Sequence, residues 1–425
     1  MDEARSEIID VEQLRPGMYI ELELGWMAHP FPTSSFKISS DKQIEIIRGL
    51  GRQQIRYVPA KSDLPDTAGV ESAATDLQPA QAQKNAEQLL RQQHAERLTA
   101  QQRDLAMCER RFGQTVRQYK QALEQVRSHP SEVMSQCQAM VNGYVSEMLT
   151  TGESAIRLLS DGMGDRLSMH PVNISILCML LGKQMGLGET EMTDLGLAAF
   201  LHDIGKLELP DRVRWQESSF SAPETKAFQA HVAQSVMLCQ RMGLPPGALQ
   251  AIAQHHEMMD GSGFPARLKG DAITLPARIL ALVNRYDDLC NPSRPAAALT
   301  PHEALALLFA QSRSCFDSTV LSSFIRMMGV YPPGSVAQLN DERYAMVVSV
   351  NSSRPLKPRV IVFDAKVPKH EALILDLEAA PELGIKRSLK PSGLPDDALN
   401  YLSPRQRICY FFEPAVDLHP HEVAP

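Results

Sequence analysis

Apolar residues recur at helical spacing through the middle of the chain and are interrupted by clusters of glycine and proline. Four segments show this pattern most strongly, namely residues 174–188, 227–243, 247–257 and 276–289. Apolar runs of this length with a period near 3.6 residues are typical of buried or half-buried helices. The pattern therefore predicts a nearly all-helical domain over residues 131–335.

The beginning of the chain shows a mixed pattern. Apolar and polar residues alternate on both sides of Pro16-Gly17, which predicts two strands flanking a turn. Residues 39–51 have the pattern of a capped helix, with Ser40 or Asp41 at the N-cap and Gly51 beyond the end. Residues 54–59 predict a closing strand. We therefore expect a small α+β module over residues 1–60 that senses or docks rather than catalyses.

The next segment, residues 61–130, combines a linker with a long helix. Residues 61–83 are polar, which favours a flexible connection. Farther along, six apolar residues occupy the a and d positions of a heptad frame: Leu105, Phe112, Val116, Tyr119, Leu123 and Val126. Two arrangements fit this stripe equally, a homodimer through the helix at 98–126 or one amphipathic helix packed on its own protein. Pro130 ends the helix.

The last part of the chain changes to short apolar runs separated by proline, glycine and asparagine. These runs lie at residues 344–350, 358–363, 372–377 and 407–412. Short runs between turn residues predict strands. We therefore expect a small β-rich appendage over residues 336–425, without chemistry of its own, on a chain that is mainly α.

Composition narrows the classes of function. The chain has 425 residues and a net charge of -7, without the basic surface that binding to a nucleic acid duplex requires. The N-terminus lacks the apolar core of a signal peptide, and the longest apolar stretch, near residues 174–181, is too short to span a membrane. Seven dispersed cysteines without a C-x-x-C pair favour reduced thiols and a cytoplasmic location.

The polar exceptions within the apolar helices carry the candidate chemistry. His202 and Asp203 end the apolar run LAAFL, and we expect the following Gly205 to end that helix in a left-handed turn. A His-Asp pair at the end of a buried helix is costly unless a metal ion compensates it. Taken singly, each histidine of this region has a structural explanation. Together, five of the twelve histidines on four buried segments indicate two metal ions, with Fe, Mn or Zn suited to nitrogen and carboxylate ligands.

The order and spacing of these residues resemble those of the HD-GYP branch of HD-domain phosphohydrolases. The resemblance rests on His170, on HDIGK at 202–206, on His231, on HHEMMDGSGFP at 255–265 and on the segment from 277, and it covers residues 150–335. The segment from Leu14 onward is similar to a domain of unknown function often fused ahead of HD-GYP domains. The resemblance implies an all-helical domain with two or three metals, commonly iron or manganese, that hydrolyses the bacterial messenger cyclic di-GMP.

The resemblance also implies roles for single residues. The metal-ligand histidines would be His170, His202, His231, His255 and His256. Asp203 matches a carboxylate that bridges the metals, and Lys206 matches a lysine that steadies a phosphate oxygen. Two ions about 3.5–4 Å apart can activate a water molecule and hold a phosphate for in-line attack. Taken alone, Lys206 fits equally well as a cation that interacts favourably with the negative end of the helix dipole at a C-terminus.

Several positions depart from the family pattern. Asn284 stands where the family has its last aspartate ligand, so affinity for a divalent ion should fall unless Asp287, on the same helical face, replaces it. The tripeptide GYP is Gly263-Phe264-Pro265, which keeps the stacking surface and loses the hydroxyl group. After the last ligand block, the family's Arg-Tyr-rich pattern is absent and Arg294 is the candidate phosphate contact. Arg166 replaces the glutamate of three-metal members, so at most two metals are expected.

These observations predict a metal-dependent phosphodiesterase that acts on cyclic di-GMP or a related cyclic dinucleotide. The alternative is a degenerate HD-GYP protein that binds ligand or signalling partners without turnover, with the loop at 260–265 as the docking surface. A third interpretation is a phosphohydrolase for another nucleotide. The candidate substrate contacts are Gly263, Phe264 and Arg294.

Overall fold

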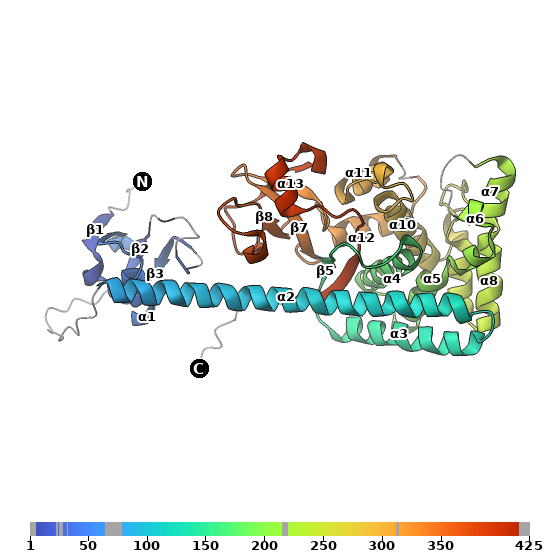
Figure 1. Cartoon of the computed structure of the whole chain (residues 1–425), viewed down its shortest axis with the longest axis horizontal. Coiled ribbons are helices and arrows are strands. Elements are labelled where there is room, and N and C mark those ends of the chain that lie inside the picture. The colour runs from blue at the N-terminus through green and yellow to red at the C-terminus, as the bar shows by residue number, and fades with distance from the viewer. Residues whose placement is uncertain are drawn as a thin grey trace. The chain divides into compact units, whose positions relative to one another are not determined.

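The computed structural model describes residues 6–22, 24, 29–31, 33–63, 79–214, 220–311 and 314–415. The chain divides into two compact units, residues 1–100 and 101–425. Most described residues are helical, and each unit contains one antiparallel sheet. The predicted fold class, mainly α with an α+β N-terminal module and β structure near the C-terminus, is therefore confirmed (Figure 1).

The N-terminal unit is a four-stranded sheet in the order β1-β4-β2-β3 with one short helix. Its elements are β1 (Glu7–Asp10), β2 (Tyr19–Glu21), β3 (Ser35–Lys37), α1 (Asp41–Arg48) and β4 (Gln54–Tyr57). Ser40 is the N-cap of α1, and Gly51 lies beyond its end with a φ of 71°, as the sequence predicts. The turn before β2 requires Gly17, which has a φ of 95° and approaches Asp63 so closely that a Cβ would lie 2.4 Å from its carbonyl oxygen.

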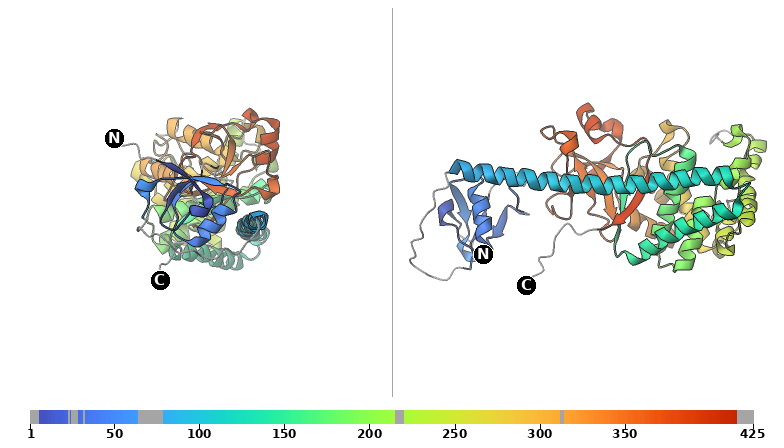
Figure 2. Two further views of the ribbon diagram at one scale, coloured as in Figure 1. Left: turned by 90° about the vertical axis from the view of Figure 1, so that its left-hand side faces the viewer. Right: turned by 60° about the horizontal axis from the view of Figure 1, so that its bottom comes forward.

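The predicted linker lies largely outside the described residues, and the helix that follows begins at Pro79. This helix, α2 (Pro79–Gln125), continues into the second unit and is followed by α3 (Pro130–Thr150). Within the second unit α2 runs antiparallel to α3 (Figure 2), and the hydroxyl groups of Thr115 and Tyr144 lie 2.6 Å apart between them.

The heptad stripe of α2 is buried within its own chain. Phe112, Val116, Tyr119 and Val126 belong to the main core, and Leu105 and Leu123 pack against it. The second of the two predicted arrangements is therefore correct. These side chains are not free to form the seam of a homodimer through the helix at 98–126, because they already contribute to the core.

The helical part of the second unit surrounds α5, whose residues from Leu195 to Leu201 are all buried. Helix α5 packs against α3, α4, α9 and α10. The helices are α4 (Arg166–Gln184), α5 (Glu189–Leu201), α6 (Asp211–Arg214), α7 (Ala222–Gln229), α8 (His231–Met242), α9 (Pro246–Gln254), α10 (Leu275–Cys290), α11 (Pro301–Gln311) and α12 (Ser318–Met328). The four helices predicted from apolar periodicity correspond to α4, α8, α9 and α10.

A seven-stranded sheet joins the C-terminal residues to the helices. Its strands are β5 (Ser154–Leu158), β6 (Val336–Leu339), β7 (Tyr344–Asn351), β8 (Arg359–Val362), β9 (Ile374–Asp376), β10 (Ile385–Leu389) and β11 (Tyr410–Pro414), and α13 (Asp396–Leu402) precedes β11. The central path is β10-β6-β7-β5-β11, with β8 on β7 and β9 on β8. Strand β5 comes from the segment that the sequence predicts to be nearly all helical. The C-terminal strands therefore share their sheet and their core with the helical region.

The remaining regular elements are short 3-10 helices. These helices are η1 (Val11–Gln13), η2 (Pro59–Lys61), η3 (Ile204–Glu208), η4 (Gly270–Ala272), η5 (Pro295–Ala297), η6 (Lys369–Glu371) and η7 (Pro391–Gly393). All seven cysteines are unpaired, as their dispersal predicts. Among the described residues, none of the helices combines the length and the apolar character needed to cross a bilayer.

Candidate metal centre

Imidazole rings from four helices converge on the carboxylate of Asp203. His170 lies in the first turns of α4, and His202 is the C-cap of α5, directly before Asp203. His231 is the first residue of α8, while His255 is the C-cap of α9 and is followed by His256. All six side chains are buried or half-buried. The structure thus brings together every histidine that the sequence predicts as a ligand.

Asp203 lies between two groups of histidines. Its Oδ2 atom is 3.6 Å from His170 Nε2 and 3.4 Å from His202 Nε2. Its Oδ1 atom is 3.5 Å from His231 Nε2 and 4.0 Å from His255 Nε2. The first set that could hold an ion is His170, His202 and Asp203, and the second is Asp203, His231, His255 and His256. Because Asp203 belongs to both sets, the arrangement suits a carboxylate shared by two ions.

Three of the rings have their tautomer fixed by the backbone. The Nδ1 atoms of His202, His231 and His255 lie 2.8, 2.6 and 2.6 Å from the carbonyl oxygens of Ala199, Phe228 and Ile252. A carbonyl oxygen only accepts hydrogen bonds, so each Nδ1 carries the proton and each Nε2 carries a lone pair in the neutral ring. These lone pairs point toward Asp203.

The rings are also held neutral, which leaves a surplus of lone pairs at the centre. Burial lowers the pKa of His202 to about 4 and those of His231 and His255 to about 3. The Nε2 atoms of His231 and His255 are only 3.4 Å apart, although neither carries a proton. Among the described residues, His202 Nε2 and Asp203 Oδ1 are buried without a hydrogen-bond partner. Divalent cations fit this donor set, because they would pair with imidazole lone pairs and with the carboxylate oxygen Oδ1 of Asp203, which has no hydrogen-bond partner among the described residues.

Lys206 supplies positive charge next to the shared carboxylate. Its Nζ atom lies 2.5 Å from Asp203 Oδ2 and 5.4 Å from the centre of the Phe228 ring. Burial alone would raise the pKa of Asp203, but Lys206 and the surrounding histidines outweigh it and hold that pKa well below its usual value. Asp203 is therefore a carboxylate at neutral pH and able to bind cations.

Gly205 has a different function from the one expected. It is not among the glycines with positive φ, so it does not end α5 in a left-handed turn. It lies in η3, against the first turn of α8, where a Cβ would lie 2.3 Å from both His231 O and Ser235 N. The absence of a side chain lets η3, which follows Asp203, approach the helix that begins with His231.

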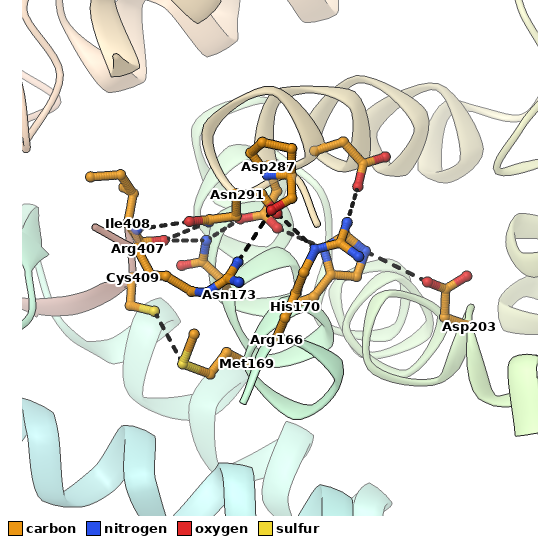
Figure 3. A network of polar contacts seen from close by, with 12 residues as sticks. Arg166, Met169, His170, Asn173, Asp203, Asp287, Asn291, Arg407, Ile408 and Cys409 are labelled. Atoms are coloured by element: carbon orange, nitrogen blue, oxygen red, sulfur yellow. Dashed lines mark hydrogen bonds and ion pairs between the residues drawn. The ribbon is translucent and has the colours of Figure 1, made fainter. Parts of the chain in front are cut away.

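The two candidate metal ligands on α10, Asn284 and Asp287, have different surroundings. Asp287 Oδ2 lies 2.6 Å from His170 Nδ1, and its Oδ1 accepts from the amide groups of Asn173 and Asn291. Asn284 lies one turn earlier and is also buried, and its Oδ1 has no hydrogen-bond partner among the described residues. Figure 3 shows Asp287 on the side of His170 opposite Asp203. Asp287 therefore orients His170, and both of its oxygens are in use.

The loop after α9 is fixed against the second group of histidines. The Phe264 ring stacks on His256 with centroids 4.5 Å apart, before a cis peptide bond to Pro265. Gly263 is required because a Cβ would lie 2.4 Å from His256 O. Buried Glu257 accepts hydrogen bonds from the amides of Ala266 and Leu268 at 2.7 and 2.8 Å. Sequence reasoning missed Glu257, although a glutamate between buried histidines and a glycine-rich turn was a visible signal.

The sequence also singles out two arginines, Arg166 and Arg294. Arg166 begins α4, where its Nε donates to Asn291 O at 2.7 Å and its guanidinium lies 3.2 Å from Asp288 Oδ1. Arg294 is exposed and caps η5. Arg166 therefore ties α4 to the end of α10, whereas a phosphate contact by Arg294 stays a prediction.

The chain matches two protein families and several curated phosphodiesterases. Residues 136–320 match the HD domain and residues 7–137 match a domain of unknown function, DUF3391. The chain is 27% identical over 379 residues to the cyclic di-GMP phosphodiesterase PA4108 of Pseudomonas aeruginosa. The matched region covers 85% of this chain and 86% of that protein.

Shorter matches to curated proteins fall on part of the chain. The cyclic di-GMP phosphodiesterase response regulator RpfG of Xanthomonas campestris is 36% identical over 150 residues, 35% of this chain and 39% of that protein. The 3'3'-cGAMP-specific phosphodiesterase 1 of Vibrio cholerae is 29% identical over 171 residues, 40% of this chain and 39% of that protein. These similarities agree with the resemblance seen in the histidine motifs.

Proposed function

Because this chain carries an HD domain with a DUF3391 domain ahead of it, we propose that it is a metal-dependent phosphodiesterase that hydrolyses cyclic dinucleotides, with cyclic di-GMP as the preferred substrate. The observation that carries the proposal is the pair of His/Asp groups that share Asp203. A relative that matches most of the chain is a cyclic di-GMP phosphodiesterase, which supports this substrate class.

The residues of the site have separate roles in this proposal. His170 and His202 with Asp203 would hold one divalent ion, and His231, His255 and His256 with Asp203 would hold a second. Two such ions, which we expect to be iron or manganese, would supply Lewis-acid charge for the attack of water on a phosphodiester. Lys206 adds a cation where negative charge develops on the phosphate oxygens.

The substrate contacts follow from the loop and from the end of α10. Phe264, stacked on His256, offers an aromatic face beside the second group of histidines, and Gly263 lets the backbone of that loop lie close to the site. Exposed Arg294 would contact a phosphate. In the reaction a water oxygen bonds to phosphorus, the P–O bond to the ribose breaks, and the released oxygen takes a proton, which opens the ring to a linear dinucleotide.

Removal and return of metal tests this proposal. Protein purified without air should contain close to two ions per chain and should hydrolyse cyclic di-GMP. Chelation should abolish hydrolysis, and Mn²⁺ or Fe²⁺ should restore it, because His202 Nε2 and Asp203 Oδ1 have no hydrogen-bond partner among the described residues and are free to bind a metal ion. Elemental analysis measures the metal content, and chromatography of the products measures hydrolysis. If the metal-loaded protein binds cyclic di-GMP and releases no linear product, the enzyme proposal fails.

One observation favours a second candidate function, ligand binding without turnover. The buried Asn284 places a neutral amide where the resemblance implies a charged ligand, and its oxygen is unpaired among the described residues. The protein would then respond to a cyclic dinucleotide through its loop at 260–265, where Ser262 and Pro265 are exposed for docking of signalling proteins.

Replacing Asn284 with aspartate should raise metal affinity by about tenfold, roughly 1.4 kcal/mol, because a carboxylate adds a negative charge at a buried position. Competition against a chelating dye measures the affinity. Asn142→Asp adds the same charge on the exposed face of α3 and should leave the affinity unchanged. An equal response of the two variants would show that position 284 does not face the ions.

A further inference from the structure

The C-terminal strand reaches the helices that carry the metal centre. Residues Ile408 to Tyr410, which lead into β11, are buried and lie outside the segment that matches the HD domain. The main-chain N–H of Ile408 donates to Asn291 Oδ1 at 2.8 Å, and that of Tyr410 donates to Asn173 Oδ1 at 2.8 Å. Two asparagine side chains, one on α4 and one at the end of α10, thus accept hydrogen bonds from the main-chain N–H groups of this segment.

The same two amides hold Asp287. Asn173 Nδ2 lies 2.5 Å from Asp287 Oδ1 and 3.3 Å from Ile408 O. Asn291 Nδ2 lies 2.9 Å from Asp287 Oδ1 and 2.8 Å from Ile408 O. Each NH2 group therefore uses both hydrogens. The amide orientations follow from the network, because a main-chain N–H can only donate and must face an oxygen.

Asp287 in turn fixes the orientation of the His170 ring. With Oδ1 occupied by two amides, Oδ2 accepts from His170 Nδ1 at 2.6 Å, which leaves His170 Nε2 facing Asp203. In His202, His231 and His255, Nδ1 donates to the main-chain carbonyl oxygen of the residue three positions earlier. His170 differs, since its acceptor belongs to α10 and is held by Asn173 and Asn291, which in turn bond to the main chain of Ile408 (Figure 3).

We infer that the segment Ile408–Tyr410 is a positioning element of the metal centre, which fixes Asp287 through Asn173 and Asn291 and thereby sets the direction of His170. The inference rests on the proposed function, in which His170 is a ligand. The strand itself is anchored, because Cys409 O accepts from Leu159 N at 2.9 Å and Tyr410 Oη lies 2.9 Å from Tyr286 Oη. The ion held by His170 and His202 therefore depends on the C-terminal sheet, whereas the ion held by α8 and α9 does not.

Substitution of the asparagines tests the inference through metal affinity. Asn291→Leu keeps the volume and removes the hydrogen bonds, so the affinity for one of two ions should fall about 10- to 100-fold, the usual effect of removing a partner behind a metal ligand. The affinity for the other ion should stay unchanged. Asn173→Ala, which leaves room for a bridging water, should act in the same direction with a smaller effect and serves if the first variant does not fold.

The matched control is Ser349→Ala. It removes a buried hydrogen bond of the same sheet, 3.2 Å long, to Glu413 on β11, which contacts neither Asp287 nor His170 in the interactions described above. This variant should bind two ions as the wild type does. If the asparagine variants bind both ions with wild-type affinity, or if Ser349→Ala weakens the same ion equally, the inference is wrong.

A second readout needs neither metal nor substrate. In histidine-labelled, metal-free protein, the Nδ1 proton of His170 should give a downfield and slowly exchanging NMR signal, because a carboxylate accepts it in a buried site. The signal should be lost in Asn291→Leu and kept in Ser349→Ala, and its persistence in both would overturn the inference. Absence of cyclic di-GMP hydrolysis in a wild type that binds two ions would instead refute only the proposed function.

Discussion

Replacing Asp203 with asparagine should remove both ions and lower the rate of cyclic di-GMP hydrolysis about a thousandfold, which corresponds to about 4 kcal/mol of activation free energy. Both sets of candidate ligands contain Asp203. Its Oδ2 atom faces His170 and His202, and its Oδ1 atom faces His231 and His255. Asparagine keeps the shape and removes the charge. Its NH2 group would also donate to imidazole lone pairs, which satisfies the site without a cation.

The same reasoning separates lost chemistry from lost folding. The new amide pairs with lone pairs that otherwise lack partners, which offsets the loss of the ion pair with Lys206. The metal-free variant should therefore stay folded, with an unfolding temperature close to that of the metal-free wild type. Asp317→Asn is the matched control, since Asp317 caps α12 and pairs with Arg278 at 2.9 Å. The control should lower thermal stability and keep two ions per chain. Two ions on the Asp203 variant would refute a shared carboxylate.

The ligand histidines could be predicted because their signal is local. Each interrupts an apolar helical pattern, and the motifs HDIGK and HHEMMDGSGFP keep the spacing of a known family. The helices follow from the helical spacing of their apolar residues. Strands β1, β2 and β4 of the N-terminal module follow from the alternation of apolar and polar residues, whereas β3 was not predicted. In the structure, α4, α5, α8 and α9 each present such an interruption to one centre.

The support of the site could not be predicted, because its signal is spread over the chain. Asn173 and Ile408 are 235 residues apart in sequence, and nothing in either segment indicates that they pair. Asp287 was considered as a replacement ligand because it lies on the same helical face as Asn284. Only the contacts to His170, Asn173 and Asn291 show that both of its oxygens are used. Likewise, β5 was not predicted, because the strands that pair with it, β7 and β11, lie far along the chain.

Gly205→Ala should lower the free energy of unfolding by about 3 kcal/mol and should loosen the ion held by the His231 group. The added Cβ would lie 2.3 Å from His231 O and from Ser235 N, and main-chain atoms in the first turn of a helix cannot rotate away. Either η3 or α8 must shift, and η3 directly follows Asp203 while α8 begins with His231. Stability and metal binding should therefore fall together.

Two further variants show whether the backbone is the cause of this loss. Gly143→Ala adds a Cβ with nothing within 4 Å in the middle of α3, so it should stabilise the protein by up to about 1 kcal/mol. Adding Ser235→Ala to the Gly205 variant removes only the hydroxyl at 2.7 Å and should not restore stability, because the contacts with His231 O and Ser235 N persist. Recovery in that double variant, followed by thermal unfolding, would mean that the side chain alone excludes a Cβ at position 205. Without recovery, the close approach of two backbones is what holds Asp203 and His231 within reach of one ion.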